Sequence, residues 1–385
     1  MSGDSASTLT WTILLVAGCL FSCPSLANVL LDDSEIAKIV RHGPWPPPKK
    51  SDPSNRVSGT MAAIALGRKL FFDPRFSSNG KISCASCHDP DCGWTDGKPR
   101  AVGLARLDRN TQSLFNARYN RWFGWDGRSD SLWAHSIGPI LAKTEMGMSV
   151  DAFARRLLND AALTGLYREA FGRFPAAATS TTLVVDAAKA MAAFQETIVS
   201  GRTAFDRFRD ALQSGDIASA GTYPAAAQRG AKIFVGRGKC NVCHAGPRFT
   251  NGEFDDSGVP YFIAAGRVDR GRHGGIRKLK TSPYNQLGRF NDAPGLATGW
   301  ATRRVRQTHR TFGQFKVPSL RELTRTAPYM HNGSLMSLED VVRHYSNINL
   351  ERIHSDGARI LQPLNLSDQQ VMDLIAFLKT ISAPD

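Results

Sequence analysis

The sequence predicts a mainly α-helical protein that contains two tandem domains. Its 385 residues exceed the roughly 100 to 200 residues of a single domain. Apolar residues recur at helical spacing in several segments, whereas no alternating run is long enough to predict a strand. One five-residue pattern occurs twice, as Cys84-Ala85-Ser86-Cys87-His88 and as Cys240-Asn241-Val242-Cys243-His244.

The composition is that of a folded, basic protein. Lys and Arg number 48 against 34 Asp and Glu, the formal net charge is +14, and 42% of the residues are hydrophobic. This hydrophobic share excludes an intrinsically disordered chain, and the glycines lack the period of collagen. A protein with several membrane spans needs repeated apolar runs of roughly 18 residues, which the sequence does not contain.

Residues 1–27 have the pattern of a secretory signal peptide. A nearly uninterrupted apolar run, Ile13 to Phe21, precedes the small-x-small cleavage pattern Ser25-Leu26-Ala27. The region before the apolar run contains Asp4 and no Lys or Arg, so a retained N-terminal anchor or a lipoprotein modified at Cys19 stays open. We expect a periplasmic protein whose mature chain has no stable membrane insertion.

Cleavage would leave five cysteines, an odd number that argues against a simple disulfide framework. Four of them form the two C-x-x-C-H patterns, which are the attachment sequence of c-type haem. At this spacing two thiols form thioethers with the haem vinyl groups, and the adjacent His ligates the iron. Zinc bound by two C-x-x-C pairs is the alternative, although the pairs are too far apart for a short finger. We expect two covalently bound haems, held by Cys84, Cys87 and His88 and by Cys240, Cys243 and His244, with Cys92 as a spare thiol.

The segments before the two patterns are also similar to each other. Gly67-Arg68-Lys69-Leu70-Phe71 precedes the first pattern and Gly230-Ala231-Lys232-Ile233-Phe234 precedes the second. This repeat indicates two tandem cytochrome c-type haem domains. Five prolines between His42 and Arg56 exclude a helix there and favour an extended segment. We predict a Pro-rich leader over residues 28–56, a first domain over 57–215 and a second over 216–385.

Four segments carry clear helix signals. In chain order, helices are predicted after a cap at Ser149, over the Ala-rich residues 183–199, after Ser337 with Asp340, and after Ser367 with Gln370. The Gly-rich, basic stretch over 266–311 is predicted to be loop.

Several short segments lie at fixed offsets from the two haem patterns, and with them the chain resembles the bacterial di-haem cytochrome c peroxidase and MauG family. The resemblance covers nearly the whole mature chain and implies that the haem at His88 reacts with hydrogen peroxide. It also implies that the haem at His244 is six-coordinate and handles electrons. The segments are Arg109-Asn110-Thr111, Trp125-Asp126-Gly127-Arg128, Gly138-Pro139, Glu145-Met146-Gly147-Met148, Phe315 to Arg321 and Thr326 to Gly333.

The second ligand of the C-terminal haem separates two branches of this family. The cytochrome c peroxidases have Met fourteen residues after the His of a P-Y-x-H segment, and here the fourteenth residue after His331 is Tyr345. Tyr at this place resembles the MauG-like, MbnH-type subgroup. A thioether favours ferrous iron, whereas a hard oxygen donor favours higher oxidation states. His344 and Met330 stay open as alternative ligands.

The resemblance also assigns residues around the peroxide-reacting haem. It implies that Glu145 is the acid and base of O–O cleavage, that Pro139 shapes the distal pocket, and that Trp125 relays charge between the haems. His135 is a further candidate for proton transfer, although a lone histidine is equally consistent with a packing role.

Calcium is the third expected cofactor. Asn110 and the carbonyls of Thr326 and Pro328 match the interdomain calcium site of the family, and oxygen donors suit this cation. The sequence departs from MauG at Gly238, where MauG has a Trp that passes oxidising equivalents to its partner. The exit route is therefore unassigned, with three aromatic residues open as candidates: Trp300, Tyr261 and Tyr284.

Three functions follow from these assignments. A MauG-like enzyme would use hydrogen peroxide to form a high-valent, bis-Fe(IV)-like state that oxidises side chains, expected to be Trp, of a partner protein. A di-haem cytochrome c peroxidase, which Tyr345 disfavours, would reduce peroxide to water with a small redox-protein donor. A non-catalytic electron carrier, the third class, is disfavoured by Glu145 and Pro139. The basic residues between Arg267 and Arg310 favour an acidic partner protein, and nucleic acid is not expected.

Overall fold

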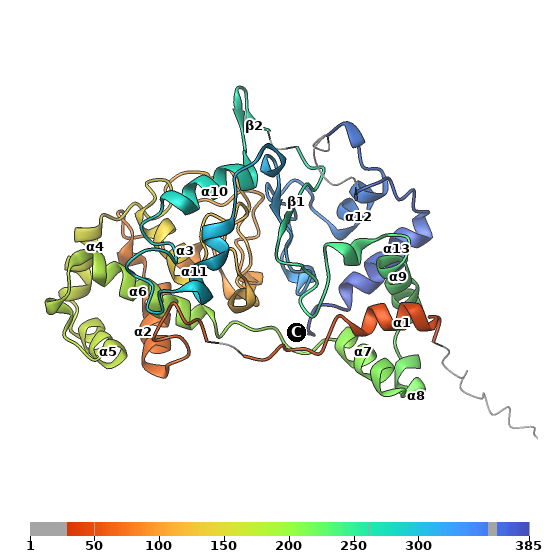
Figure 1. Cartoon of the computed structure of the whole chain (residues 1–385), viewed down its shortest axis with the longest axis horizontal. Helices are drawn as coiled ribbons and strands as arrows, with labels where there is room; N and C mark the ends of the chain where they lie inside the picture. Colours follow the sequence, from red (N-terminus) through yellow and green to blue (C-terminus); the bar gives the residue numbers. More distant parts are fainter. Residues whose placement is uncertain (1–28, 50, 261, 353–359, 385) are drawn as a thin grey trace, which may run out of the picture.

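The computed structural model describes residues 29–49, 51–260, 262–352 and 360–384. The predicted signal peptide and Tyr261 lie outside the described residues. Within the described ranges the chain forms thirteen α-helices and four strands of two or three residues, which confirms the mainly α fold class. Figure 1 shows two helical lobes side by side, and each lobe has its own apolar core.

The first lobe forms around one long helix, α6 (Ser180–Gln195), which matches the predicted Ala-rich helix. Every residue from Leu183 to Gln195 is buried, because neighbouring helices cover α6 on several sides. The other helices of this lobe are α2 (Met61–Phe72), α3 (Leu132–Leu141), α4 (Val150–Leu158) and α5 (Ala161–Phe171). Helix α4 begins at the predicted cap, where the Ser149 side chain accepts a hydrogen bond from the backbone of Ala152.

The second lobe is built on the close pair α9 (Ala225–Val235) and α13 (Asp368–Lys379). Both predicted capping boxes are present: Ser337 with Asp340 begins α12 (Leu338–Ser346), and Ser367 with Gln370 begins α13. The remaining helices of this lobe are α1 (Asp33–Val40), α7 (Ala204–Ser214) and α8 (Ile217–Gly221).

The packing of α1 and α7 differs from the predicted division of the chain. Helix α1 lies inside the predicted leader, because Asp32 and Glu35 form a capping box and Ile39 packs into the second core. The predicted first domain includes α7, yet Phe205 and Phe208 of this helix lie in the core of the second lobe. Between α1 and α2 the described residues form no helix, as the prolines of this segment predict.

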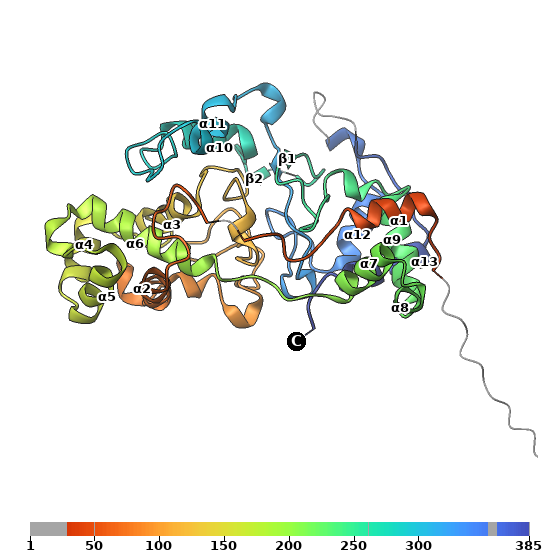
Figure 2. The ribbon, with the colours of Figure 1, turned by 60° about the horizontal axis from the view of Figure 1, so that its bottom comes forward.

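The prediction of a loop over residues 266–311 is wrong. This stretch contains α10 (Gly271–Thr281) and α11 (Leu296–Arg304), which Figure 2 shows as a layer above α3. Although it follows the second cysteine pattern, the stretch is bound to the first lobe. Lys189 of α6 pairs with Asp292 (2.7 Å), and Thr302 of α11 donates to Asp130 (2.6 Å). Helix α10 is Gly-rich and weakly periodic, so its helical state depends on this tertiary packing.

The four strands are short and form two antiparallel pairs. Strand β1 (Phe254–Asp255) pairs antiparallel with β4 (Phe315–Lys316), and β2 (Phe262–Ala264) forms a hairpin with β3 (Arg267–Val268). Among the described residues, nine 3₁₀ turns of three residues each complete the chain. In the same ranges, no helix combines the length and the apolar character needed to cross a bilayer.

The repeated glycines before the cysteine patterns allow two close helix crossings. A Cβ atom at Gly67 of α2 would collide with the backbone of Ala190 in α6, and a Cβ at Gly230 of α9 would collide with the backbone of Asp373 in α13. Each lobe therefore holds the helix that precedes its cysteine pattern directly against a long partner helix, which explains the repeat seen in the sequence.

We predict that Gly230→Ala destabilises the second lobe by about 1–3 kcal/mol, because the added methyl group forces α9 and α13 apart. The free energy of unfolding, measured by chemical denaturation, checks this. Gly165→Ala in α5 is the matched control: no atom lies within 4 Å of the added Cβ, so a change of about 1 kcal/mol toward greater stability is expected. Equal effects of both substitutions would contradict the crossing argument.

Candidate active site

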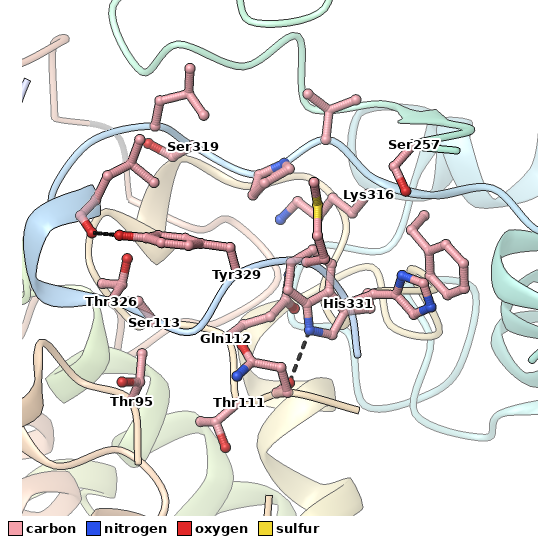
Figure 3. Close-up of a pocket in the computed structure, with 18 of the residues that line it drawn as sticks. Thr95, Thr111, Gln112, Ser113, Ser257, Lys316, Ser319, Thr326, Tyr329 and His331 are labelled. Atoms are coloured by element: carbon pink, nitrogen blue, oxygen red, sulfur yellow. Dashed lines mark hydrogen bonds between the residues drawn. The ribbon is translucent and has the colours of Figure 1, made fainter. Parts of the chain in front are cut away.

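One continuous cavity lies between the two lobes and reaches both C-x-x-C-H patterns. Its lining includes Cys84, Cys87 and His88 at one end and Cys240, Cys243 and His244 at the other. Apolar side chains surround each end, among them Phe71, Ile82 and Leu114 in the first lobe and Phe234, Val342 and Leu374 in the second. Figure 3 shows part of this cavity, with Lys316, Tyr329 and His331 among the residues that line it.

The two histidines have equivalent orientations. Nδ1 of His88 lies 3.1 Å from the carbonyl oxygen of Trp94, and Nδ1 of His244 lies 3.0 Å from that of Phe249. Trp94 and Phe249 both adopt positive φ angles, 61° and 53°, which turn these carbonyls toward the rings. Because a carbonyl only accepts, each Nδ1 carries the proton and each Nε2 keeps a lone pair for a metal.

The cysteine pairs fit haem attachment better than zinc. They lie in different lobes, and among the described residues no three His, Cys, Asp or Glu side chains gather as a metal site. Burial raises the pKa of the Cys84 and Cys240 thiols to about 12, which does not favour a reactive thiolate. The cysteine pairs would hold a haem covalently at each end of the cavity, and His88 and His244 would supply an imidazole nitrogen to its iron.

Glu145, His135 and Pro139 line the end of the cavity that contains His88. Burial raises the pKa of Glu145, while the positive charge of Arg128 opposes that shift. Burial lowers the pKa of His135 to about 3, so this ring is neutral at pH 7. Pro139 lies inside α3 and lacks an N–H, so the carbonyl of His135 has no helical donor from that position.

Glu145 is held by a tight backbone turn. Its N–H donates to the carbonyl of Ala142, and its own carbonyl accepts from Leu104 (3.0 Å). A Cβ at Gly103 would lie 2.7 Å from the Cα of Glu145, so only glycine permits this approach. The short loop between α3 and α4 is therefore fixed against residues 103–105.

Trp125 lies in the same cavity and is anchored at both its side chain and its backbone. Its indole Nε1 donates to the carbonyl of Asn110 (2.9 Å), and its carbonyl accepts from the backbone N–H of Lys316 (2.8 Å). The cavity lining thus places Trp125 together with residues of both cysteine patterns.

Two basic residues of this site have no role in the sequence analysis. Arg128 acts electrostatically on Glu145, His135 and Asp126. The buried Lys316 lines the cavity and donates to the carbonyl of Trp122 (2.8 Å), and burial lowers its pKa to about 7. Both residues lie within segments that carry the family resemblance, and their position in those segments is the signal that marks them.

A buried ion-pair network fixes the segment that follows Trp125. Arg109 contacts Asp126 (2.9 Å) and forms a two-point contact with Asp269 (both distances 2.7 Å). The Arg109 guanidinium lowers the pKa of both carboxyl groups below the ordinary value of 3.8. This network ties the Trp125 loop to the base of the β2–β3 hairpin.

The three predicted calcium ligands all line the cavity. Asn110 donates through Nδ2 to the carbonyl of Lys98 (2.8 Å), which orients the amide and leaves Oδ1 as an acceptor. Thr326 and Pro328 belong to a segment of the other lobe and line the same cavity. The backbone N–H of Asn110 also donates to the carbonyl of His331 (2.8 Å), which brings these two segments together.

Tyr345 lines the second end of the cavity, on α12. Burial raises its pKa, and the neighbouring Cys240 and Cys243 act in the same direction. His344 is engaged elsewhere, because its Nε2 lies 2.8 Å from the carbonyl of Ser257. Met330 also lines the cavity. The geometry thus favours Tyr345 over His344 and leaves Met330 as the second candidate.

Position 238 is closed to a side chain. A Cβ at Gly238 would lie 2.7 Å from the carbonyl oxygen of Ile233 and 3.3 Å from Sγ of Cys240. A larger residue at this position would require the backbone or the Cys240 side chain to move.

A helical fold with two such cysteine–histidine sites, an acid and a tryptophan in one shared cavity defines a di-haem c-type oxidoreductase of the peroxidase type. A family model described as di-haem cytochrome c peroxidase matches residues 61–214. The chain belongs to the di-haem cytochrome c peroxidase family, because a MauG protein of this family is 36% identical to it over 97% of this chain, in agreement with the family model.

The methylamine utilization protein MauG of Methylorubrum extorquens is 36% identical over 380 residues, covering 97% of this chain and 94% of that protein. The cytochrome c551 peroxidase of Nitrosomonas europaea is 30% identical over 343 residues, covering 86% of this chain and 83% of that protein. A MauG-like protein associated with microbial copper homeostasis shares the fold, with a TM-score of 0.64 and 24% identity over 89% of this chain and 96% of that one. The diheme peroxidase BthA from Burkholderia thailandensis has a TM-score of 0.65 and 22% identity, over 87% of this chain and 89% of that one. Membership implies two haems, hydrogen peroxide as oxidant and a partner or electron donor.

We predict that Arg109→Met destabilises the protein by about 3–5 kcal/mol at pH 7, because it leaves two buried carboxylates without their main partner. The wild-type stabilisation is present above pH 3.8, the ordinary value for Asp, and is lost as the pH falls toward the lowered values of the folded state. The difference between the two proteins should therefore shrink below about pH 4, which denaturation at several pH values can measure.

Arg267→Met is the matched control for this prediction. Arg267 pairs with Asp108 between the same two segments, but the two side chains are 60% and 45% exposed. Its loss should cost less than about 1 kcal/mol. A cost for Arg109→Met as small as that of the control would show that the buried network does not stabilise the fold.

Proposed function

We propose that this protein is a periplasmic MauG-like enzyme that uses hydrogen peroxide to oxidise side chains, expected to be Trp, of a partner protein. Reduction of one peroxide to two waters takes two electrons and two protons, and the partner side chains supply both electrons. When bound, the two haems supply the reaction with peroxide and the storage of its oxidising equivalents. The periplasmic location rests on the predicted signal peptide and on c-type haem attachment.

Tyr345 is the observation that carries this proposal. Its hydroxyl group comes from the capped helix α12, beside the cysteine pair that would hold the second haem. A hard oxygen ligand stabilises oxidised iron and disfavours its reduction by a small donor protein. A Met ligand would have the opposite effect and would suit a peroxidase that is first half-reduced.

Glu145 is the group that we propose moves the proton during O–O cleavage. The carboxylate accepts a proton from the oxygen of peroxide that binds, and returns it to the oxygen that leaves as water. A carboxyl group with a raised pKa is suited to both steps. The neutral His135 ring can accept or donate a hydrogen bond there without adding a charge, and Pro139 limits the space for a sixth protein ligand.

Trp125 is proposed to connect the two ends of the cavity. It lies with both cysteine patterns in one lining, and two hydrogen bonds hold it in place. Its indole N–H donates to a carbonyl, so the ring keeps a fixed orientation while it exchanges electrons.

The second candidate function is a cytochrome c peroxidase that takes electrons from a small redox protein. The similarity to the cytochrome c551 peroxidase favours it, and the family includes both activities. Met330, which also lines the cavity, would serve as the ligand of this alternative.

We also propose that calcium binds between the lobes at Asn110, Thr326 and Pro328. These residues offer one amide oxygen and two carbonyl oxygens from segments of both lobes, which is the oxygen-rich set that calcium prefers. A cation there would fix the spacing of the two haem sites.

The test of the main proposal adds hydrogen peroxide to the purified, fully ferric protein. We expect the optical spectra of both haems to change without prior reduction, because the second site already stabilises oxidised iron. Tyr345→Met should remove this behaviour and make half-reduction necessary. A wild-type protein that stays inert until half-reduced, and then rapidly oxidises a small cytochrome, would establish the peroxidase instead.

Two further variants separate the roles of the residues. Glu145→Gln should slow the reaction with peroxide by about 10²–10⁴-fold and leave the low-spin haem signal unchanged. Tyr345→Phe should change that low-spin signal at once, and an unchanged signal would show that Met330 or another group ligates the iron. Glu253→Gln, at an exposed carboxyl group, is the control for loss of a negative charge.

For calcium, we expect a chelator to lower the melting temperature of the holoprotein and calcium, but not magnesium, to restore it. Magnesium retains its water shell more strongly and needs a stricter octahedral geometry. Asn110→Ala should show the lower melting temperature with no response to calcium. A melting temperature that a chelator does not change would exclude a structural calcium.

A further inference from the structure

The structure indicates where a partner would meet this protein, on a surface that we call the α10–α11 face. It is defined by exposed side chains of α10 and α11 and of one residue that follows α11 shortly afterwards. These side chains are Arg277, Lys280, Trp300, Arg303, Arg304 and, after α11, Arg306. Figure 2 shows these helices as an outer layer of the first lobe. Among the described residues, no acidic side chain forms an ion pair with Arg277, Lys280, Arg303 or Arg306.

Hydrogen bonds join the two helices of this face to each other and to the lobe beneath. The carbonyl of Thr308 lies 3.0 Å from Nδ1 of His273, and Gln307 donates to the carbonyl of His273 (2.8 Å), which joins the end of α11 to α10. Thr302 donates to the buried Asp130 beneath (2.6 Å). A preordered surface loses little conformational entropy when a partner binds.

Trp300 gives the face the character of a protein-binding site. Its side chain is 50% exposed, and the Arg304 guanidinium lies 4.9 Å from the ring centroid. The exposed Leu287 adjoins this helix at Gly299. Tryptophan and arginine are the residues most enriched at the energetic centres of protein interfaces, and positive side chains without an acidic partner among the described residues favour an acidic partner protein.

The α10–α11 face also lies directly over the relay tryptophan. A Cβ at Gly275 of α10 would collide with the backbone of Asp126, so the helix packs against the residue that follows Trp125. Arg272 donates to the carbonyl of Gly127 (2.8 Å), and Lys278, whose side chain is 59% exposed, reaches the carboxylate of Asp126 at 4.0 Å. Helix α10 therefore packs on the segment that contains Trp125, whereas a Cβ at position 238 would collide with the carbonyl of Ile233.

We propose that an acidic protein docks on the α10–α11 face, and that electrons enter through this face toward Trp125. This inference rests on the proposed function, because hydrogen peroxide is the oxidant. In each step one side chain of the partner loses one electron and one proton, and the electron passes inward through Trp125. Two such steps deliver the two electrons that convert one peroxide, with two protons, into two waters.

The test measures binding to the ferric holoenzyme with a strongly acidic small c-type cytochrome as the probe. Wild type should bind it with an affinity that falls as salt rises. The triple variant R303E/R304E/R306E should weaken binding by about 10-fold or more, mainly through slower association. Trp300→Ala should weaken it by a similar factor through faster dissociation, and Trp300→Phe should recover most of that loss.

The matched control is R155E/R207E/K379E, which makes the same change in net charge at exposed positions on α4, α7 and α13. It should bind the probe within about twofold of wild type. Equal weakening by both triple variants would overturn the proposal, because it would show attraction to the overall charge only. Wild-type binding to anionic vesicles but not to the acidic cytochrome would also overturn it, in favour of a lipid surface.

A second measurement separates this inference from the proposed function. The rate at which peroxide-treated protein oxidises the reduced probe should fall in R303E/R304E/R306E by the same factor as binding. If wild-type haems do not react with peroxide in the ferric state, the proposed function fails whatever the probe does. If they react normally and the triple variant binds and oxidises the probe as wild type does, only the docking face is wrong.

Discussion

The chemistry of the cavity depends on the orientation of two imidazole rings. Each ring is held by one hydrogen bond from Nδ1 to a carbonyl, and each carbonyl belongs to a residue with a positive φ angle, Trp94 or Phe249. Without that bond the ring could rotate or change tautomer, and Nε2 would no longer be reserved for iron. The positive φ angles at these two positions thus orient the carbonyls that hold the two rings. The close helix crossings at the glycines of α2 and α9 also fix the helix that precedes each cysteine pattern.

The two lobes are less independent than a tandem repeat implies. The stretch with α10 and α11 comes from the second half of the sequence, yet it packs on the first lobe and covers the Trp125 loop. Arg109 of the first lobe also binds this stretch, through its ion pair with Asp269. Because buried charges tolerate little displacement, this network holds Asp126, the residue after Trp125, in a fixed position.

The sequence allowed the fold class and four helices to be predicted, because capping residues and apolar spacing are local signals. Ser149, Ser337 and Ser367 cap the helices that they predict. Helices α10 and α11 could not be predicted, because their stability comes from distant contacts such as those of Arg272 and Thr302. The membership of α7 in the second lobe is likewise a property of packing and not of its own pattern.

In the candidate site, too, some residues have a signal in the sequence and others are recognised only from the packing. The residues that the family resemblance marks lie around one cavity, whereas the charges that act on them, Arg128 and Lys316, have no local signature of their own. A lysine in a polar segment predicts an exposed cation, and only the three-dimensional structure shows that Lys316 is buried against the carbonyl of Trp122.

The position of α1 has a consequence for the order of assembly. This first helix packs against α7 and α9, in the same core as α13, the last helix of the chain. The core of the second lobe is therefore complete only when residues near both ends of the described chain have packed together.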